Sequence, residues 1–277
     1  MDEQIVAIYT LINDLLKGMR HQEDKQCRMN DSEIITTALV AALYFGGNHE
    51  IARTFLREKG YIPEMLSKSR FSRRLHRVTH HIVSFIEILG DHWKALNSDS
   101  IYVIDTFPIP VCDNWRIRRC RIYHEEKYRG KIASKRRYFY GLKLHLMVTA
   151  QGQPVEFFIT PGSESDVTHL KSFQFDLPDG SEIYADKIYN DYELEDLIEE
   201  TGQVQLRPIR KKNSKRPYPP WYDYWVRVHR KIVETTGSSI KRRMLNKIHA
   251  VTAAGFELKI ALFVLAESFS HLFKVAT

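Results

Sequence analysis

The sequence is poor in cysteine, and its few cysteines follow no recognisable pattern. Its 277 residues include only Cys27, Cys112 and Cys120, an odd number with irregular spacing and no CxxC pair. A disulfide framework calls for an even set, and a cysteine-based zinc site calls for paired thiols. Neither is predicted, and we expect a reducing cytoplasm.

The chain also lacks a long uninterrupted apolar run. Its most apolar stretch, residues 256–273, is broken by Glu257, Lys259 and Glu267. This pattern predicts a packed C-terminal helix rather than a membrane span. The first twenty residues begin acidic and show no cleavable signal pattern. We therefore expect no membrane partner.

Positive charge, in contrast, is in excess. The 41 Lys and Arg residues outnumber the 34 Asp and Glu residues, which gives a formal charge of +7 and a pI of about 9.2. This balance favours an anionic partner, with nucleic acid ahead of a membrane surface. A basic protein without a polyanionic partner is the alternative. The length suits one large domain or two modest ones.

Residues 1–97 predict an all-helical N-terminal domain. Apolar residues recur at helical spacing over residues 4–19, a capping signal lies at residues 30–32, and Gly60 is a plausible helix stop. Residues 67–96 predict one longer amphipathic helix with a basic first half.

Strand and helix patterns alternate over residues 98–250. Strand composition occurs at 101–105, 138–150, 154–162, 182–186 and 203–209, and helical patterns occur at 166–173, 190–202 and 225–251. The first strand is expected to end before Pro108 and Pro110. The order predicts an α/β fold with a mixed sheet flanked by helices. Residues 251–277 are expected to form a C-terminal helix that packs on this domain.

Three acids occupy notable positions in this pattern. Asp105 ends the first strand, Asp186 ends the fourth, and Glu234 lies in the last long helix. If those strands are neighbours, a helix crossing their edge would bring three carboxylates together. Oxygen ligands of this kind suit two Mg²⁺ or Mn²⁺ ions that act in phosphoryl transfer. Alternatively, Asp105 accepts local backbone N–H groups and Asp186 caps a turn.

The last helix carries bases on the same face as its acid. Arg230, Glu234 and Lys241 are spaced i, i+4 and i+11, which places them in one stripe. Such a stripe can bind a metal through the acid and phosphate through the bases. An ordinary solvated ion pair is the alternative.

Basic runs interleaved with aromatic residues provide candidate DNA contacts, because Lys and Arg neutralise phosphates and aromatic rings stack on bases. Solvated loop charge is the alternative. His76 and His80 lie at i, i+4, but no further ligand accompanies them, so we expect a surface helix there. The candidate contacts are Arg116, Arg118, Arg119, Lys135, Arg136, Arg210, Lys211 and Lys212, with Arg73 and Arg74 in the N-terminal domain.

The arrangement of these segments resembles bacterial insertion-sequence transposases of the DDE type. The resemblance rests on residues 104–112 (IDTFPIPVC), 140–166 (ending in a Gly-Ser…Asp turn), 185–191 (ADKIYND) and 230–241 (RKIVETTGSSIK, an Arg-x3-Glu-x6-Lys signature). Arg227 stands where the family usually has tyrosine, and Ile188 where it usually has glycine. Asp166, in the turn, is expected to cap the following helix or to assist the site.

The resemblance implies a ribonuclease H-like catalytic domain. Asp105, Asp186 and Glu234 would be its catalytic and metal-binding triad, with two Mg²⁺ or Mn²⁺ ions, and Arg230 and Lys241 would contact DNA or steady the site. Double-stranded DNA, as element ends and as target, would be the partner of a homodimer in the bacterial nucleoid. The helical domain of residues 1–97 would bind the DNA ends. No small-molecule cofactor is expected.

Three other functions stay open at this point. A metal-dependent, structure-specific nuclease on the same fold would cut DNA without joining it. A transposase-derived DNA-binding protein would have no activity. A sugar hydrolase also uses paired carboxylates, but it does not need the basic runs.

Overall fold

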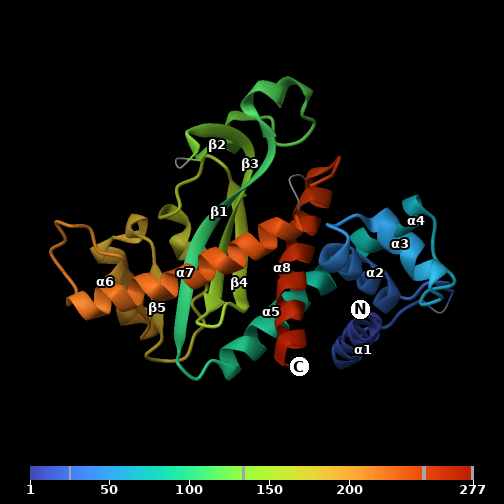
Figure 1. The fold of residues 1–277 in the computed structure, drawn as a ribbon, viewed down its shortest axis with the longest axis horizontal. Helices are drawn as coiled ribbons and strands as arrows, with labels where there is room; N and C mark the ends of the chain where they lie inside the picture. Colours follow the sequence, from blue (N-terminus) through green and yellow to red (C-terminus); the bar gives the residue numbers. More distant parts are fainter. Residues whose placement is uncertain (25, 133–134, 245–247, 276–277) are drawn as a thin grey trace. The chain divides into compact units, whose positions relative to one another are not determined.

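The computed structural model describes the chain except for residues 25, 133–134, 245–247 and 276–277. It divides into two compact units. One contains residues Met1–Ile88 and Ser239–Thr277, and the other contains Leu89–Ser238. Figure 1 shows helices in the first unit and the sheet in the second. No described helix has the length and apolar character needed to cross a membrane.

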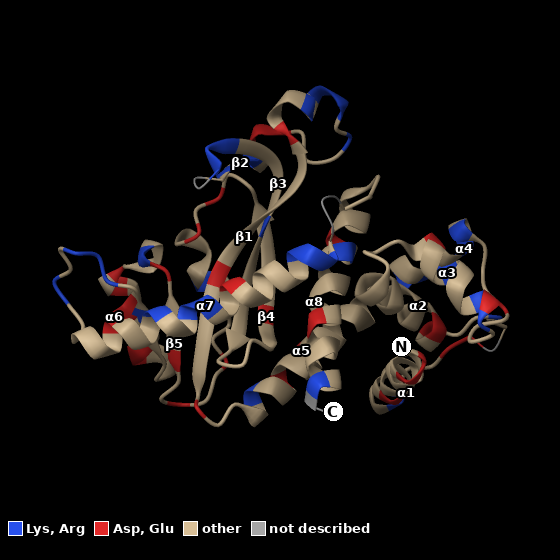
Figure 2. Ribbon diagram, viewed as in Figure 1, with Lys and Arg blue, Asp and Glu red and all other residues tan. Residues whose placement is uncertain are grey.

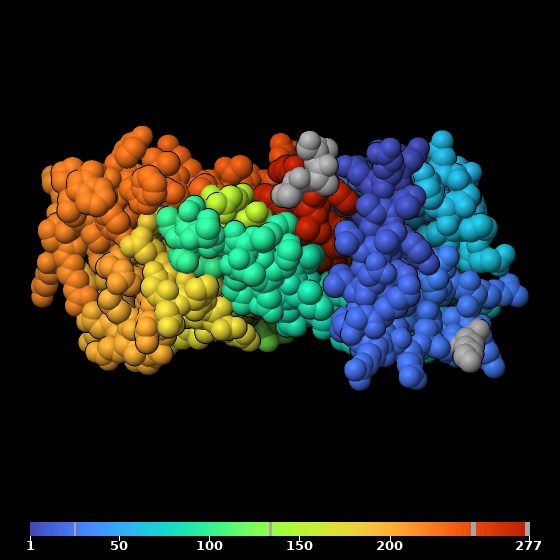
Figure 3. Space-filling model, turned by 90° about the horizontal axis from the view of Figure 1, so that it is seen from below, coloured from blue at the N-terminus to red at the C-terminus, as the bar shows by residue number. Residues whose placement is uncertain are grey.

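The first unit is built from helices that pack their apolar side chains against one another. They are α1 (Asp2–Gly18), α2 (Asp31–Tyr44), α3 (His49–Glu58), α4 (Lys68–Arg77), the first part of α5 (Thr79–Leu96) and α8 (Ala253–Val275). In α1, Ile5, Ile8 and Ile12 are buried at helical spacing, and α1 lies at the surface in Figure 3 (dark blue). Asn30 caps α2 with Glu33 in a capping box, which confirms the predicted signal.

The C-terminal helix packs within the helical unit. Helix α8 contacts α2, and packing on the catalytic domain stays a prediction for residues 251–277. Its buried face includes Phe256, Phe263 and Phe269. Gly47, with a φ of +74°, passes so close to the Phe263 ring that a Cβ at residue 47 would approach it to 2.8 Å. An apolar face shows that a helix is packed, but not which element covers it.

The predicted long helix over residues 67–96 is divided in two. Helix α4 ends at Arg77, with Val78 as its C-cap, and α5 begins at Thr79. The Thr79 hydroxyl donates to the carbonyl of His76 at 3.0 Å. Such local side-chain bonds compete with the helical ladder, which explains a break that apolar periodicity alone does not reveal.

The second unit contains a six-stranded mixed sheet. Its strands are β1 (Ile101–Asp113), β2 (Arg129–Ile132), β3 (Arg137–Thr149), β4 (Pro154–Pro161), β5 (Glu182–Ala185) and β6 (Gln205–Pro208). The order is β2-β3-β1-β5-β6, with β4 also paired to β3. Strand β1 runs antiparallel to β3 and parallel to β5. The first and fourth predicted strands are therefore neighbours, as the site hypothesis requires.

Strand β1 continues through the two prolines at which it was predicted to break. Pro108 lies opposite Lys143 and Pro110 opposite Gly141 in the pairing with β3, and a register shift follows Pro110. In the described residues β1 pairs with β5 only over Ile101–Val103. The prolines thus lie where one edge carries no described partner strand, and proline is tolerated at edges and bulges.

Helices cover the sheet and deliver the third acid. Helix α6 (Tyr192–Gly202) contacts β6, and α7 (Pro220–Arg243) crosses β1 in Figure 1. At the crossing, any Cβ on Gly237 would collide with the Phe107 ring. This glycine lets α7 approach β1 closely, which brings the preceding turn of α7 towards Asp105.

Further local differences from the prediction leave the fold class unchanged. Residues 166–173 form only the short 3-10 helix η4 (Thr168–Ser172), and β2 was not predicted. The predicted α/β class is confirmed: a mixed sheet is flanked by helices and preceded by a helical region. This architecture is consistent with a ribonuclease H-like fold.

Candidate functional site

The three predicted acids meet at one arginine. Arg230 Nη2 lies 3.7 Å from Asp105 Oδ2 and 3.7 Å from Asp186 Oδ2, and Arg230 Nη1 lies 2.8 Å from Glu234 Oε1. Figure 2 shows acids in red beside bases in blue where α7 crosses the sheet. The structure therefore brings together side chains from β1, from the end of β5 and from α7.

In each aspartate, one carboxylate oxygen accepts a local backbone hydrogen bond and the other faces Arg230. Asp105 Oδ1 accepts the backbone N–H of Thr106 at 2.8 Å, and Asp186 Oδ1 accepts that of Lys187 at 2.7 Å. The Oδ2 atom of each faces Arg230. The local hydrogen bonds considered as alternatives are thus present, and they orient the carboxylates without using up both oxygens.

The cluster carries more negative than positive charge. Three carboxylates share the single guanidinium of Arg230, and the Asp105 side chain is only 16% exposed. Burial raises the pKa of Asp105 to about 6; the Thr106 N–H and Arg230 lower it, while Asp186 and Glu234 raise it further. A cluster of this composition is electrostatically suited to accept an additional cation.

The side chains as they stand do not form a coordination shell. Within the described part of the chain, no three His, Cys, Asp or Glu side chains are grouped so as to hold a metal ion. The position of Arg230 accounts for this at the acid cluster, because its guanidinium contacts all three carboxylates. His76 and His80 likewise belong to no such group.

A hydrogen-bonded network that the sequence analysis missed lies next to the acids. Thr106 Oγ1 is 3.0 Å from His145 Nδ1 and 2.8 Å from the Tyr189 hydroxyl, and His145 Nε2 is 2.9 Å from Thr160 Oγ1. Thr106 and His145 are cross-strand partners in β1 and β3. The sequence hinted at two of these residues only through their proximity to the acids: Thr106 directly follows Asp105, and Tyr189 lies three residues after Asp186.

Asp166 does not cap a helix. It accepts from Lys143 Nζ at 2.8 Å, and Lys143 also donates to the carbonyl of Glu164 at 2.6 Å. The N-cap of η4 is Val167, without a side-chain bond. The expected capping role is therefore wrong, because Lys143 of β3 donates to this carboxylate instead.

Ile188 fits the turn after the second aspartate. It lies in the 3-10 helix η5 (Lys187–Tyr189), capped by Asp186, and is 47% exposed. It is absent from the described non-glycine residues with positive φ. The turn as folded here therefore does not require glycine at this position.

Most of the predicted DNA contacts lie at the surface. Arg116 stacks on Trp115, which is 72% exposed, with 4.2 Å between the guanidinium carbon and the ring centre. Segment 210–225, orange in Figure 3, reaches the surface with Trp221 and Tyr224 exposed. The exposed predicted contacts are Arg73, Arg116, Arg118, Arg119, Lys135, Arg136, Lys211, Lys212 and Lys241.

Two predicted DNA contacts are engaged in internal ion pairs. Arg210 binds Glu195 through 2.6 and 2.8 Å contacts, and both side chains are 6% exposed. Arg74 donates to Glu23 at 2.9 Å and to Asp31 at 2.5 Å. These placements argue against DNA contacts for Arg74 and Arg210. Counting basic residues in a run cannot separate a buried ion pair from a free surface charge.

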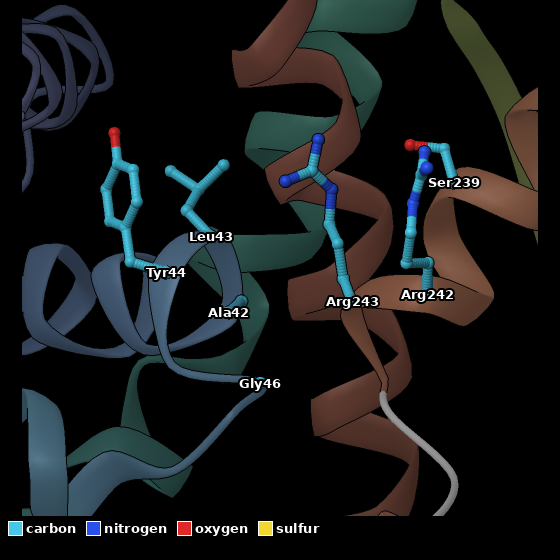
Figure 4. A pocket seen from close by; sticks show the side chains of 7 residues that line it. All are labelled: Ala42, Leu43, Tyr44, Gly46, Ser239, Arg242 and Arg243. Carbon is cyan, nitrogen blue, oxygen red and sulfur yellow. The ribbon is translucent and has the colours of Figure 1, made fainter.

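A pocket of about 290 Å³ lies in the helical unit and shares no lining residue with the acid cluster. Figure 4 shows Tyr44 and Leu43 of α2 facing Arg243 at the end of α7. Arg243 Nε and Ser239 Oγ donate to Glu267 Oε2 at 3.0 and 2.9 Å, and Glu267 is buried. This arginine is therefore already neutralised, and the pocket assembles no catalytic groups.

Comparison with known proteins gives one finding. A family model described as the transposase DDE domain matches residues 95–250, a span that includes all three acids of the cluster. No match was found among curated proteins or among solved structures.

Proposed function

The chain belongs to the transposase DDE domain family, and from this membership we propose that it is a DNA transposase. It would cleave DNA at the ends of an insertion sequence and join the freed 3′-hydroxyl ends to target DNA. The observation that carries the proposal is the convergence of Asp105, Asp186 and Glu234 on Arg230.

The acid cluster fits divalent cations in its chemistry. Its donors are carboxylate oxygens, which Mg²⁺ and Mn²⁺ prefer, and one guanidinium does not balance three negative charges. Asp105, Asp186 and Glu234 would hold two such ions. When bound, the ions would activate the attacking oxygen and stabilise the leaving oxygen of a phosphodiester.

The remaining roles follow from where the bases lie. Arg230 is positioned to neutralise either the carboxylates or an incoming phosphate, because its guanidinium is 3.7 Å from two of its partners, beyond ordinary hydrogen-bond length. Lys241 and the exposed bases Arg116, Arg118, Arg119, Lys135, Arg136, Lys211, Lys212 and Arg73 would contact DNA phosphates. We propose a homodimer on paired DNA ends, working in the cytoplasm at the nucleoid.

Nicking of supercoiled plasmid in Mn²⁺ tests the proposal, with wild type and Glu234→Ala purified in parallel. Wild type should nick, and Glu234→Ala should not. Lys231→Ala, one turn away on α7 and exposed, is the matched control for a surface change and should nick. Equal nicking by wild type and Glu234→Ala would contradict the assignment of Glu234.

A second assay separates transposase from nuclease. A DNA end with a free 3′-hydroxyl is incubated with protein and target plasmid, and joined products are sought. Joining supports the transposase. Cutting without joining supports the structure-specific nuclease instead, and DNA binding without either reaction supports the inactive DNA-binding derivative.

A further inference from the structure

The backbone pairing that aligns β1 with β5 ends before the two aspartates. The last parallel pair in the described residues joins Val103 to Tyr184. Asp105 and Asp186 each lie two residues beyond that pair. Their separation is therefore not fixed by the strand ladder, and other contacts must hold the two chain segments together.

The hydroxyl of Thr106 makes such a contact. Thr106 follows Asp105, and its Oγ1 is 2.8 Å from the hydroxyl of Tyr189, which closes the turn after Asp186. Its backbone N–H also donates to Asp105 Oδ1. One residue thus contacts the first carboxylate directly and the segment that carries the second through Tyr189.

The opposite side of this contact is held by a buried ring. His145 is 1% exposed, stacks on Phe158 with 4.4 Å between ring centres, and has a threonine hydroxyl at each nitrogen, from Thr106 and Thr160. Burial lowers the pKa of His145 to about 3, so the ring is neutral. A neutral imidazole donates from one nitrogen and accepts at the other, and a hydroxyl can serve either.

We propose that Thr106, Tyr189 and His145 form a positioning clamp that sets the spacing of Asp105 and Asp186 and thereby the affinity of the site for divalent cations. The inference rests on the proposed function, because it assumes that these aspartates bind the cations. Residues that orient metal ligands typically change metal affinity about 10–100-fold when altered. These three are positioning residues: they act on the cation through the two aspartates and are assigned no contact with the substrate.

Calorimetric titration of the full chain with Mn²⁺, without DNA, tests the clamp apart from activity. Tyr189→Phe and Thr106→Val each remove a hydroxyl at nearly constant shape and should weaken Mn²⁺ binding about tenfold. Thr106→Ser retains the hydroxyl and should restore wild-type affinity. Tyr184→Phe is the matched control: Tyr184 is also buried, but its hydroxyl bonds Glu182 and Trp225, so Mn²⁺ affinity should not change.

The outcomes separate the clamp from the metal site itself. Wild-type affinity in both Tyr189→Phe and Thr106→Val overturns the clamp, and Tyr189→Phe alone decides if Thr106→Val fails to fold. Equal weakening in Tyr184→Phe also overturns it, because a general loss of packing would then explain the result. If Asp105→Asn binds Mn²⁺ as wild type does, the proposed metal site fails, and the clamp fails with it.

Discussion

Two arginines of the sheet-containing unit sit beside carboxylates and differ in charge balance. Arg210 has one carboxylate partner, Glu195, which it contacts at 2.6 and 2.8 Å, and it also donates to the Asn190 side chain at 3.3 Å. Arg230 meets three carboxylates, two of them at 3.7 Å. The first arrangement is a closed ion pair that needs no further ligand. The second has excess negative charge and loose contacts, which are the features expected of a cation-binding site rather than of a structural pair.

The largest effect on activity should come from removing one acid of the cluster around Arg230. Asp105→Asn is expected to reduce Mn²⁺-dependent nicking about a hundredfold or more, because it removes a proposed metal ligand. Its stability should be equal to or higher than that of wild type, because burial and two neighbouring carboxylates disfavour the charged Asp105. Plasmid nicking in Mn²⁺ measures the activity, and urea unfolding in EDTA measures the stability. If Asp105→Asn were destabilised enough to account for its lost nicking, the contrast between the acid cluster and the Arg210–Glu195 pair would be contradicted.

Breaking the Arg210–Glu195 pair should lower the stability of the protein and leave its nicking activity intact. Glu195→Ala leaves the Arg210 guanidinium buried without its carboxylate and should destabilise the protein by about 3–5 kcal/mol, as measured by urea unfolding. Nicking per folded molecule should be retained. Asp196→Ala is the control, because the neighbouring Asp196 makes an exposed pair with Arg216 and should cost less than about 1 kcal/mol. Equal costs for Glu195 and Asp196 would remove the distinction.

Neutralising the central arginine should favour the added cation. Arg230→Gln is expected to increase the rise in melting temperature that Mn²⁺ produces, because Mn²⁺ would no longer compete with the guanidinium for the carboxylates. Arg227→Gln on the same helix is the control, since Arg227 pairs with Asp223 at 2.7 Å, and should leave the shift unchanged. A smaller Mn²⁺ shift in Arg230→Gln would show that the arginine helps the cation to bind.

A smaller effect is expected from the partly buried His49 imidazole, which lies near basic side chains and makes the stability of the protein depend on pH. Burial, with Lys259, His76 and Arg53 nearby, lowers the pKa of His49 to about 4. Between that value and the ordinary 6.5, the unfolded chain binds more protons. Stability is therefore fully present above pH 6.5 and falls as the pH drops towards 4, by about 1–2 kcal/mol at pH 5.

His49→Gln should flatten this part of the stability curve. Urea unfolding of wild type and His49→Gln at pH 7 and pH 5 checks it, with His92→Gln, an exposed histidine of α5, as control. The same pH dependence in wild type and His49→Gln would show that other groups cause the acid sensitivity.

The acids were predictable because their positions follow local rules. Strand composition ended at Asp105 and at Asp186, and an α/β order made neighbouring strands plausible. The structure added the register, which places both residues the same distance past the last β1–β5 pair. The placement of Arg230 among the acids was not foreseen in detail, since helical spacing gives the stripe but not the partner across from it.

The errors share a physical origin in contacts between distant segments. Strand β1 passes through Pro108 and Pro110 because one of its edges has no described partner there, which depends on sheet order. Arg210 is buried because α6 supplies Glu195, which a basic run does not reveal. The Thr106 network depends on the β1–β3 register. Local pattern therefore predicted the α/β class and the convergence of the three acids, whereas the pairing of charges and hydroxyls required the fold.

Anomalous diffraction from crystals of the protein soaked in Mn²⁺ would locate the cation site itself. We expect Mn²⁺ peaks bounded by the carboxylate oxygens of Asp105, Asp186 and Glu234, with the Arg230 guanidinium displaced from between them. Crystals that show Mn²⁺ only elsewhere, with Arg230 still in contact with all three acids, would contradict this expectation.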